Sequence, residues 1–120
     1  MSWGKTYKIS SSLKKDERVF RKPGLPGDLL ENIVRVIVRY LNPERIIISG
    51  SRARGDYRKT SDIDIAIDCK GDIVFPGEIL DEEVSTLLKF NIVNLRKVNK
   101  RLRREILREG ITVYEKGRAG

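Results

Sequence analysis

The sequence predicts one α+β domain, a two-layer α/β arrangement in which helices pack on one face of a small mixed β-sheet. Short β-branched or alternating segments recur between segments of helical period, in the order helix, strand, strand, helix, strand, helix, strand. The length of 120 residues suits a single hydrophobic core. No apolar segment is long enough to span a membrane, which favours a soluble protein.

Residues 1–24 are predicted to be a basic N-terminal extension, and residues 25–120 to form the folded domain. The extension shows little periodicity and carries more lysine and arginine than acidic residues. One interpretation is a solvated arm without function, because disorder concentrates at chain termini. The alternative is that its apolar side chains pack on the domain or on a partner; they are Trp3, Tyr7, Ile9 and Phe20.

The first predicted helix, 28–41, follows a turn-rich segment with two prolines and two glycines. Asp28 and Glu31 have the spacing of a capping box, and Asn42-Pro43 ends the helix. One broad apolar stripe is expected to pack on the sheet; it consists of Leu29, Leu30, Ile33, Val34, Ile37, Val38 and Leu41. The β-branched run 46–48 is then the first strand.

The remaining elements follow the same logic. A second helix is predicted over 78–89, with Ile79, Leu80, Val84, Leu87 and Leu88 facing inward. Residues 90–95 are the third strand, and 99–109 are a third helix that Gly110 ends in the position of a left-handed cap. Residues 111–114 form a short last strand.

The segment 45–68 contains most of the candidate site residues. Its first strand ends at Ser49-Gly50-Ser51, where Gly50 allows a sharp bend and the close approach of an anion such as phosphate. After a polar loop, strand alternation sends Asp62 and Asp64 to one face and a buried row of Ile63, Ile65 and Ile67 to the other. Two neighbouring carboxylates need a shared cation, and hard oxygen ligands suit Mg²⁺, which in turn indicates nucleotide phosphates.

This order of Gly50-Ser51, a short loop with arginine and glycine, and Asp62-x-Asp64 in a strand resembles the nucleotidyltransferases related to DNA polymerase β. The minimal nucleotidyltransferases are the most similar, and the resemblance covers most of the chain after Gly24. It implies the polymerase β-like fold and transfer of a nucleoside monophosphate from a nucleoside triphosphate, expected to be ATP, with two Mg²⁺ ions. Many such proteins are encoded beside a HEPN-domain protein as antitoxins that modify it, so a HEPN-type partner is expected.

The resemblance also implies roles for individual residues. Gly50 and Ser51 would bind the triphosphate, Ser51 through its hydroxyl, and Asp62 and Asp64 would bind the metal ions. Arg52 adjoins Ser51 and is predicted to contact a phosphate, with pairing to Asp62 as the alternative. The other cations of the loop, Arg54, Arg58 and Lys59, could also approach a phosphate, although each singly fits a surface charge.

The family pattern has a third carboxylate in a later strand, and here that position is Asn91. Asn94 replaces the second acid of the same strand. An amide can donate one oxygen to a metal, but it supplies no negative charge and takes no proton. Two hypotheses therefore stand: an active nucleotidyltransferase in which Asn91 is a catalytic position, or a catalytically degenerate module that neutralises its partner by contact only. Asp68, further along the strand, is interpreted as structural or as a surface residue.

The net charge of +8 favours polyanionic partners: nucleotides, nucleic acid or an acidic protein surface. Seven basic residues lie in or just before the third helix: Arg96, Lys97, Lys100, Arg101, Arg103, Arg104 and Arg108. The solvent-exposed face of an amphipathic helix explains these residues best. Nucleic-acid binding is the more specific alternative, but no interleaved aromatic side chains support base stacking.

Other composition features concern compartment and assembly. The single Cys69 forms no internal disulfide and the chain opens without an apolar signal run, so we expect a cytoplasmic protein. Abundant Lys, Arg, Glu and Ile, with no histidine or glutamine, are typical of hyperthermophile proteins. The edge of the short last strand favours a homodimer or a complex with a helical partner.

Overall fold

The computed structural model describes residues 22–71, 73, 76–84 and 86–117, so the predicted basic extension lies outside the described residues except for 22–24. The described part contains four helices and four strands. In chain order they are α2 (Gly27–Leu41), β1 (Arg45–Ser49), α3 (Ser51–Arg54), β2 (Ile63–Asp68), α4 (Pro76–Glu83), β3 (Phe90–Asn94), α5 (Lys100–Glu109) and β4 (Ile111–Glu115). None of these helices is long and apolar enough to cross a membrane.

The four strands form one mixed sheet in the order β3-β2-β1-β4. β1 pairs antiparallel with both β2 and β4, and β2 pairs parallel with β3. The predicted α+β class with a small mixed sheet is confirmed. Two strand pairings determine which residues lie beside Asp64. It is opposite Ser49 of β1 on one side and opposite Asn91 of β3 on the other.

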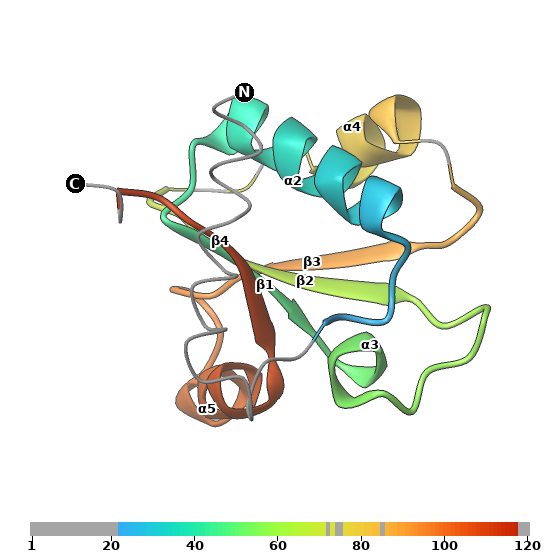
Figure 1. The fold of residues 1–120 in the computed structure, drawn as a ribbon. Coiled ribbons are helices and arrows are strands. Elements are labelled where there is room, and N and C mark those ends of the chain that lie inside the picture. The colour runs from blue at the N-terminus through green and yellow to red at the C-terminus, as the bar shows by residue number, and fades with distance from the viewer. Residues whose placement is uncertain (1–21, 72, 74–75, 85, 118–120) are drawn as a thin grey trace.

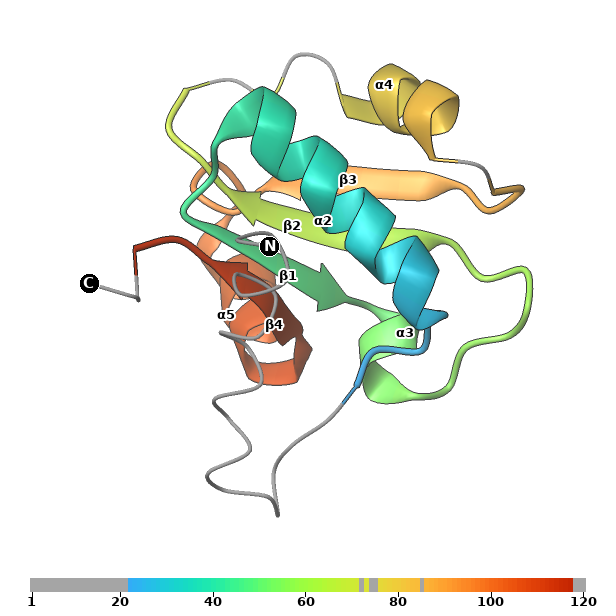
Figure 2. The same ribbon diagram turned by 45° about the horizontal axis from the view of Figure 1, so that its top comes forward.

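One face of the sheet is covered by α2 and α4, which lie above it in Figure 1; Figure 2 shows α2 crossing over β1 and β2. The predicted isoleucine row of β2 points into this layer, since Ile63, Ile65 and Ile67 are each 0–1% exposed. They pack with buried residues of α2 such as Ile33 and Ile37. The predicted strand alternation is therefore confirmed.

The opposite face is covered by α5, which lies below the sheet in Figure 1. A second apolar cluster joins Ile106 of α5 to Ile47, Ala66 and Leu95. The expectation that helices pack on one face only is corrected here. Alternation places Ile47 and Ala66 on this face, and these apolar side chains also need cover from water. α5 thus shares the sheet face that carries Asp62 and Asp64.

α4 is shorter than predicted, and this changes the position of one side chain. The helix ends at Glu83 instead of residue 89. Leu87 was predicted to face inward, but it is 103% exposed, whereas Leu80 and Val84 are buried as predicted. Because residues after Glu83 leave the helical path, the helical period no longer predicts where their side chains point.

One predicted helix end was right and two predicted caps were wrong. Helix α2 ends at Leu41, directly before Asn42-Pro43 as predicted, and Asn42 is left-handed with φ 49°. A cap that was not predicted forms at the start of α5, where the side chain of Asn99 accepts a hydrogen bond from the Leu102 N–H, 2.8 Å away. At the start of α2, by contrast, the N-cap is Pro26 and no side-chain cap forms, so the capping box is absent. Gly110 is extended (φ −74°, ψ 163°) and not left-handed. Glycine is required there because a Cβ would collide with the Ile47 side chain.

Candidate functional site

The site is built around the turn that follows β1. Gly50 has φ 67° and ψ −153°, a conformation that residues with a side chain rarely adopt. A Cβ at Gly50 would also overlap the carboxylate of Asp64. Glycine is therefore needed for two reasons: it can adopt this backbone conformation, and it leaves room for the Asp64 carboxylate of β2. The short helix α3 begins directly after this turn at Ser51.

Three polar side chains converge beside the turn. Asp62 directly precedes β2, Asp64 is the second residue of β2, and Asn91 is the second residue of β3. The Nδ2 group of Asn91 donates hydrogen bonds to Oδ2 of Asp62 and to Oδ1 of Asp64, both at 3.0 Å. The neutral amide thus bridges two carboxylates that would otherwise repel each other. The structure brings together Gly50, Asp62, Asp64 and Asn91 as the sequence predicted.

The donor set of this trio fits Mg²⁺. Two carboxylates lie close enough to share a partner, and a half-turn of the Asn91 amide about its terminal torsion would present its oxygen instead of its nitrogen. Within the described residues, no group of three or more His, Cys, Asp or Glu could hold a metal ion. An ion bound here would therefore take two charged ligands from the chain, with the Asn91 oxygen as a neutral third.

Arg52 lies elsewhere than the sequence predicted. Its side chain is buried and stacks over the Tyr57 ring, with the guanidinium carbon 4.9 Å from the ring centroid. Its guanidinium donates five hydrogen bonds to four backbone carbonyl oxygens, at 2.6–3.2 Å; they belong to Gly24, Arg58, Lys59 and Ser61. Arg52 therefore holds the loop that leads into Asp62 and is not directed at the turn where a phosphate would bind.

A cavity of about 320 Å³ opens between Asp64 and α5. One wall comes from the sheet and the turn, and the other from the inner face of α5. The lining residues from the sheet, the turn and α3 are Ser49, Gly50, Arg54, Asp64, Ile65, Asn91 and Val93, and those from α5 are Leu102, Glu105, Ile106 and Glu109. This volume lies at the lower end of the range for small-molecule sites. The mixed lining can receive a ligand with one charged and one apolar end.

Arg54 is the cation at the turn end of the cavity. Its guanidinium pairs with Asp56 at 3.3 Å and with Glu109 at 3.6 Å. The hydrogen bond to Asp56, followed by the charges of Asp56 and Glu109, raises the pKa of Arg54 above its ordinary value. The sequence named Arg54 only as one of several cations that could approach a phosphate. Its place in the cavity makes it a better candidate than Arg52.

Sequence reasoning missed the two glutamates of α5. Glu105 and Glu109 lie on the same helix face as Leu102 and Ile106, at the i, i+3, i+4, i+7 spacing that marks one side of a helix. That spacing was visible in the sequence. It did not show which face of the sheet the helix covers, so the glutamates could not be assigned to the site.

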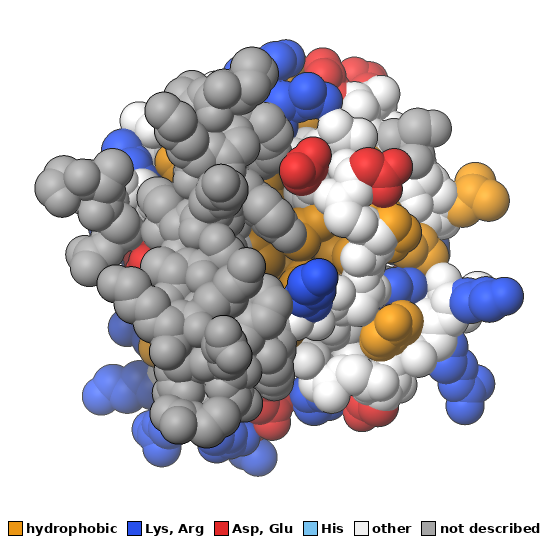
Figure 3. Space-filling model, in the orientation of Figure 1, with side chains coloured by type: hydrophobic (Ala, Val, Ile, Leu, Met, Phe, Trp, Pro, Cys, Tyr) orange, Lys and Arg blue, Asp and Glu red, His pale blue; other side chains and the backbone are white. Residues whose placement is uncertain are grey.

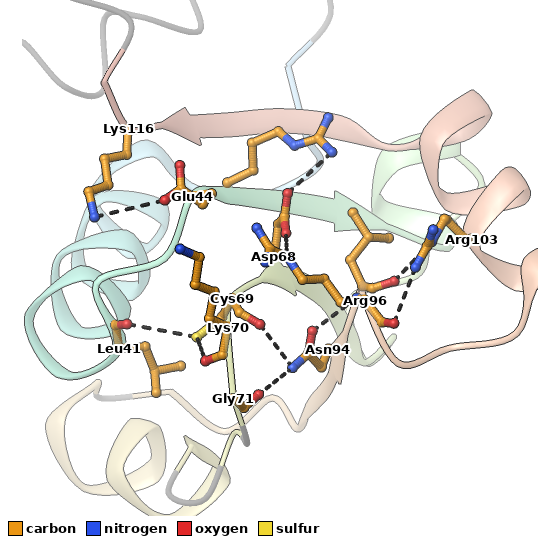
Figure 4. Close-up of polar contacts among 12 residues, drawn as sticks. Leu41, Glu44, Asp68, Cys69, Lys70, Gly71, Asn94, Arg96, Arg103 and Lys116 are labelled. Atoms are coloured by element: carbon orange, nitrogen blue, oxygen red, sulfur yellow. Dashed lines mark hydrogen bonds and ion pairs between the residues drawn. The ribbon is translucent and has the colours of Figure 1, made fainter.

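Asp68 and Asn94 belong to a structural network away from the cavity (Figure 4). Asp68 accepts from Arg45 at 3.4 Å and from Arg96, and the bond to Asp68 raises the pKa of Arg96. The Asn94 amide donates to the carbonyl oxygens of Cys69 and Gly71. The structural interpretation of Asp68 is therefore confirmed, and Asn94 holds the turn at the end of β2.

The basic residues of α5 are exposed, as a solvated face predicts. Lys and Arg side chains gather at the lower left of Figure 3, where Figure 1 places α5. Several are already engaged. Arg101 pairs with Glu105 at 3.9 Å, Arg108 pairs with Glu109 at 3.4 Å, and Arg103 donates to the carbonyl oxygens of Leu95 and Arg96.

Comparisons with known proteins agree with this geometry. The family model described as "Polymerase beta, Nucleotidyltransferase" matches residues 31–119. The chain is 38% identical over 81 residues to "Putative protein adenylyltransferase MJ0604" of Methanocaldococcus jannaschii, a match that covers 59% of this chain and 78% of the relative.

A solved structure shares the fold. It is described as "Crystal structure of the toxin-antitoxin with AMP-PNP" and superposes with a TM-score of 0.57 at 20% identity, over 73% of this chain and 75% of the other. The family model spans most of the chain, including the turn, both aspartates and Asn91. The chain therefore belongs to the polymerase β nucleotidyltransferase family, where it resembles the minimal nucleotidyltransferases.

Proposed function

We propose that this protein is a Mg²⁺-dependent nucleotidyltransferase that takes ATP and transfers AMP to a hydroxyl group of a partner protein. The observation that carries the proposal is the convergence of Asp62, Asp64 and Asn91, with the Asn91 amide 3.0 Å from each carboxylate, beside the Gly50 turn. The similarity to a named protein adenylyltransferase supports ATP as the nucleotide and a protein as the acceptor.

In the proposed reaction, the acceptor oxygen attacks the α-phosphorus, the bond from that phosphorus to the oxygen bridging to the β-phosphate breaks, and pyrophosphate leaves. Asp62 and Asp64 would hold Mg²⁺, which neutralises charge on the phosphates and on the leaving pyrophosphate. Gly50 and Ser51 would contact the triphosphate, and Arg54 can reach it from the cavity wall. Asn91 cannot take the acceptor's proton, so the proton goes to one of the two carboxylates or to water.

We further propose that the partner is a HEPN-type protein and that the pair acts as toxin and antitoxin. A toxin–antitoxin complex with a bound ATP analogue has the same fold, which supports a partner and a nucleotide together. Residues 25–120 would be the catalytic domain, and the basic residues before them an extension available for contacts with the partner or a nucleic acid.

A second candidate function is neutralisation of the partner by contact without turnover. Asn91 favours it, because an amide in place of a carboxylate removes one negative charge from the metal-binding set and one proton acceptor from the site. Binding of Mg²⁺ and nucleotide is compatible with both candidates. Only transfer to the partner separates them.

Calorimetry with Mg²⁺ and a non-hydrolysable ATP analogue tests the nucleotide site. Wild-type protein should bind the analogue only with Mg²⁺, and Asp62→Asn combined with Asp64→Asn should remove that binding, because both charged ligands are lost. Asp81→Asn is the control, since Asp81 is an exposed carboxylate of α4, on the other face of the sheet. Unchanged metal-dependent affinity in the double variant would show that the site has been misplaced.

A further inference from the structure

We propose that the α5 side of the cavity binds the nucleoside, and that Glu105 is a specificity-determining residue that selects bases with an exocyclic amino group. The inference rests on the proposed function, because it assumes that a nucleoside triphosphate occupies this cavity. It adds the chemical class of the base and the residue that recognises it.

The two ends of the cavity differ in their chemistry along α5. Its turn end is marked by Gly50 and by Arg54, whose guanidinium lies 3.6 Å from Glu109. Glu105 lies four residues earlier on the helix, which is about 6 Å along the helix axis. The triphosphate belongs at the end with the glycine turn and the arginine. The nucleoside must then extend toward Glu105.

The walls at the far end suit a flat aromatic ring. Val93 of β3 and Leu102 and Ile106 of α5 line the cavity together with Glu105. Ile106 is buried and fixed in the second apolar cluster, whereas Leu102 is partly exposed. Apolar walls exclude a charged phosphate and favour the faces of a base.

Glu105 is the polar group at this end. The ion pair of Glu105 is with Arg101 at 3.9 Å, and the Arg101 side chain is 91% exposed, so water competes strongly with that contact. Glu109, by contrast, is engaged by Arg54 and Arg108. Glu105 can therefore exchange its partner for a ligand at small cost.

A carboxylate only accepts hydrogen bonds. Glu105 therefore favours adenine and cytosine, which present an amino group where hypoxanthine and uracil carry a carbonyl oxygen. It repels that carbonyl oxygen, which directly flanks the one ring N–H on the same edge of hypoxanthine or uracil that could donate to the carboxylate. A hydrogen bond to a charged group corresponds to a preference of about ten- to a hundredfold. CTP and UTP form the sharpest pair for a test, because they differ only at this position and the adjacent ring nitrogen.

The experiment is a measurement of Mg²⁺-dependent affinity for CTP and UTP, and for ATP and ITP, in wild-type protein and in Glu105→Gln. Wild type should bind CTP and ATP about ten- to a hundredfold more tightly than UTP and ITP. The glutamine amide can donate as well as accept, so Glu105→Gln should bring both ratios close to one.

Glu109→Gln is the matched control, one helical turn away in the same cavity. It should change the affinity for all four nucleotides by a common factor, because Glu109 contacts Arg54 at the phosphate end. Amino-to-oxo ratios that stay the same in Glu105→Gln, with binding intact, overturn the role of Glu105 alone. Wild-type protein that binds none of the four nucleotides overturns the proposed function, and the inference with it.

Discussion

Replacing Arg52 should lower the stability of the protein without directly affecting its contacts with a bound phosphate. Arg52→Met keeps the apolar stem and removes the guanidinium, which donates five hydrogen bonds to four backbone carbonyl oxygens. It also removes the contact with the Tyr57 ring. The affected carbonyls hold the segment around Gly24 and the loop of residues 58–61 against the start of α3.

The size of the effect follows from these bonds. A hydrogen bond to a charged group contributes about 1.5–3 kcal/mol, but water can reach most of the freed carbonyls because the loop of residues 58–60 is exposed. We therefore expect a loss of about 3 kcal/mol in the free energy of unfolding, well below the sum of five bonds. For a chain of this size the melting temperature should fall by roughly 10–15 °C.

Urea unfolding followed by circular dichroism measures this loss, and Arg54→Met is the control. Arg54 is half-exposed and its pairs with Asp56 and Glu109 lie at the surface, so Arg54→Met should leave the unfolding midpoint close to that of wild type. Nucleotide affinity should fall in Arg54→Met instead. If Arg52→Met were as stable as wild type and bound nucleotide more weakly, the structural role given to Arg52 would be refuted. Arg52 would then be the phosphate contact, as the sequence predicted.

Three further predictions concern the core, the turn and the alkaline limit. Ile65→Ala should lower the free energy of unfolding by about 2–4 kcal/mol, since Ile65 is buried, whereas Leu87→Ala at an exposed position should cost less than about 0.5 kcal/mol in the same urea titration. Gly50→Ala should abolish Mg²⁺-nucleotide binding in calorimetry because its Cβ overlaps the Asp64 carboxylate; Gly55→Ala, which also has positive φ but open space around it, should keep that binding. Burial raises the pKa of Tyr114 above its ordinary value of 10.0, so the folded protein retains a proton that the unfolded chain loses, and stability falls as pH rises through the folded pKa. Urea midpoints between roughly pH 8 and pH 11 should therefore fall less in Tyr114→Phe than in wild type, and equal slopes would contradict that role.

Strand periodicity predicted most of the site. Two-residue alternation placed Asp62 and Asp64 on the face opposite Ile63 and Ile65, and the structure confirms this arrangement. The family pattern placed Asn91 beside them, and the parallel pairing of Asp64 with Asn91 confirms that position. These inferences succeeded because a strand has a fixed period and a sheet has a fixed spacing.

The choice between Arg52 and Arg54 could not be predicted in the same way. Both arginines belong to the four-residue helix α3, and no apolar stripe in so short a segment indicates which side chain points inward. Burial of Arg52 depends on carbonyl oxygens from residues 24 and 58–61, contacts that arise only in the folded chain.

The position of α5 also could not be predicted from the sequence. An amphipathic pattern shows that one helix face is buried, but it does not show which face of the sheet receives it. The side chains of Ile47 and Ala66 decide this, because they lie on the face opposite the main core and need apolar cover. Glu105 and Glu109 enter the site only through that packing.

The most direct test of the central claim is transfer of label from α-labelled ATP to a co-expressed partner protein, with Mg²⁺, by wild type, Asn91→Asp and Asn94→Asp. Wild type should transfer slowly, and Asn91→Asp should raise the rate by about a hundred- to ten-thousandfold, because it supplies the third negative charge and a proton acceptor. Asn94→Asp should not raise it, since Asn94 donates to the Cys69 and Gly71 carbonyls away from the cavity. Brisk wild-type transfer that Asn91→Asp leaves unchanged would contradict the account of Asn91, and transfer that survives Asp62→Asn combined with Asp64→Asn would contradict the site itself.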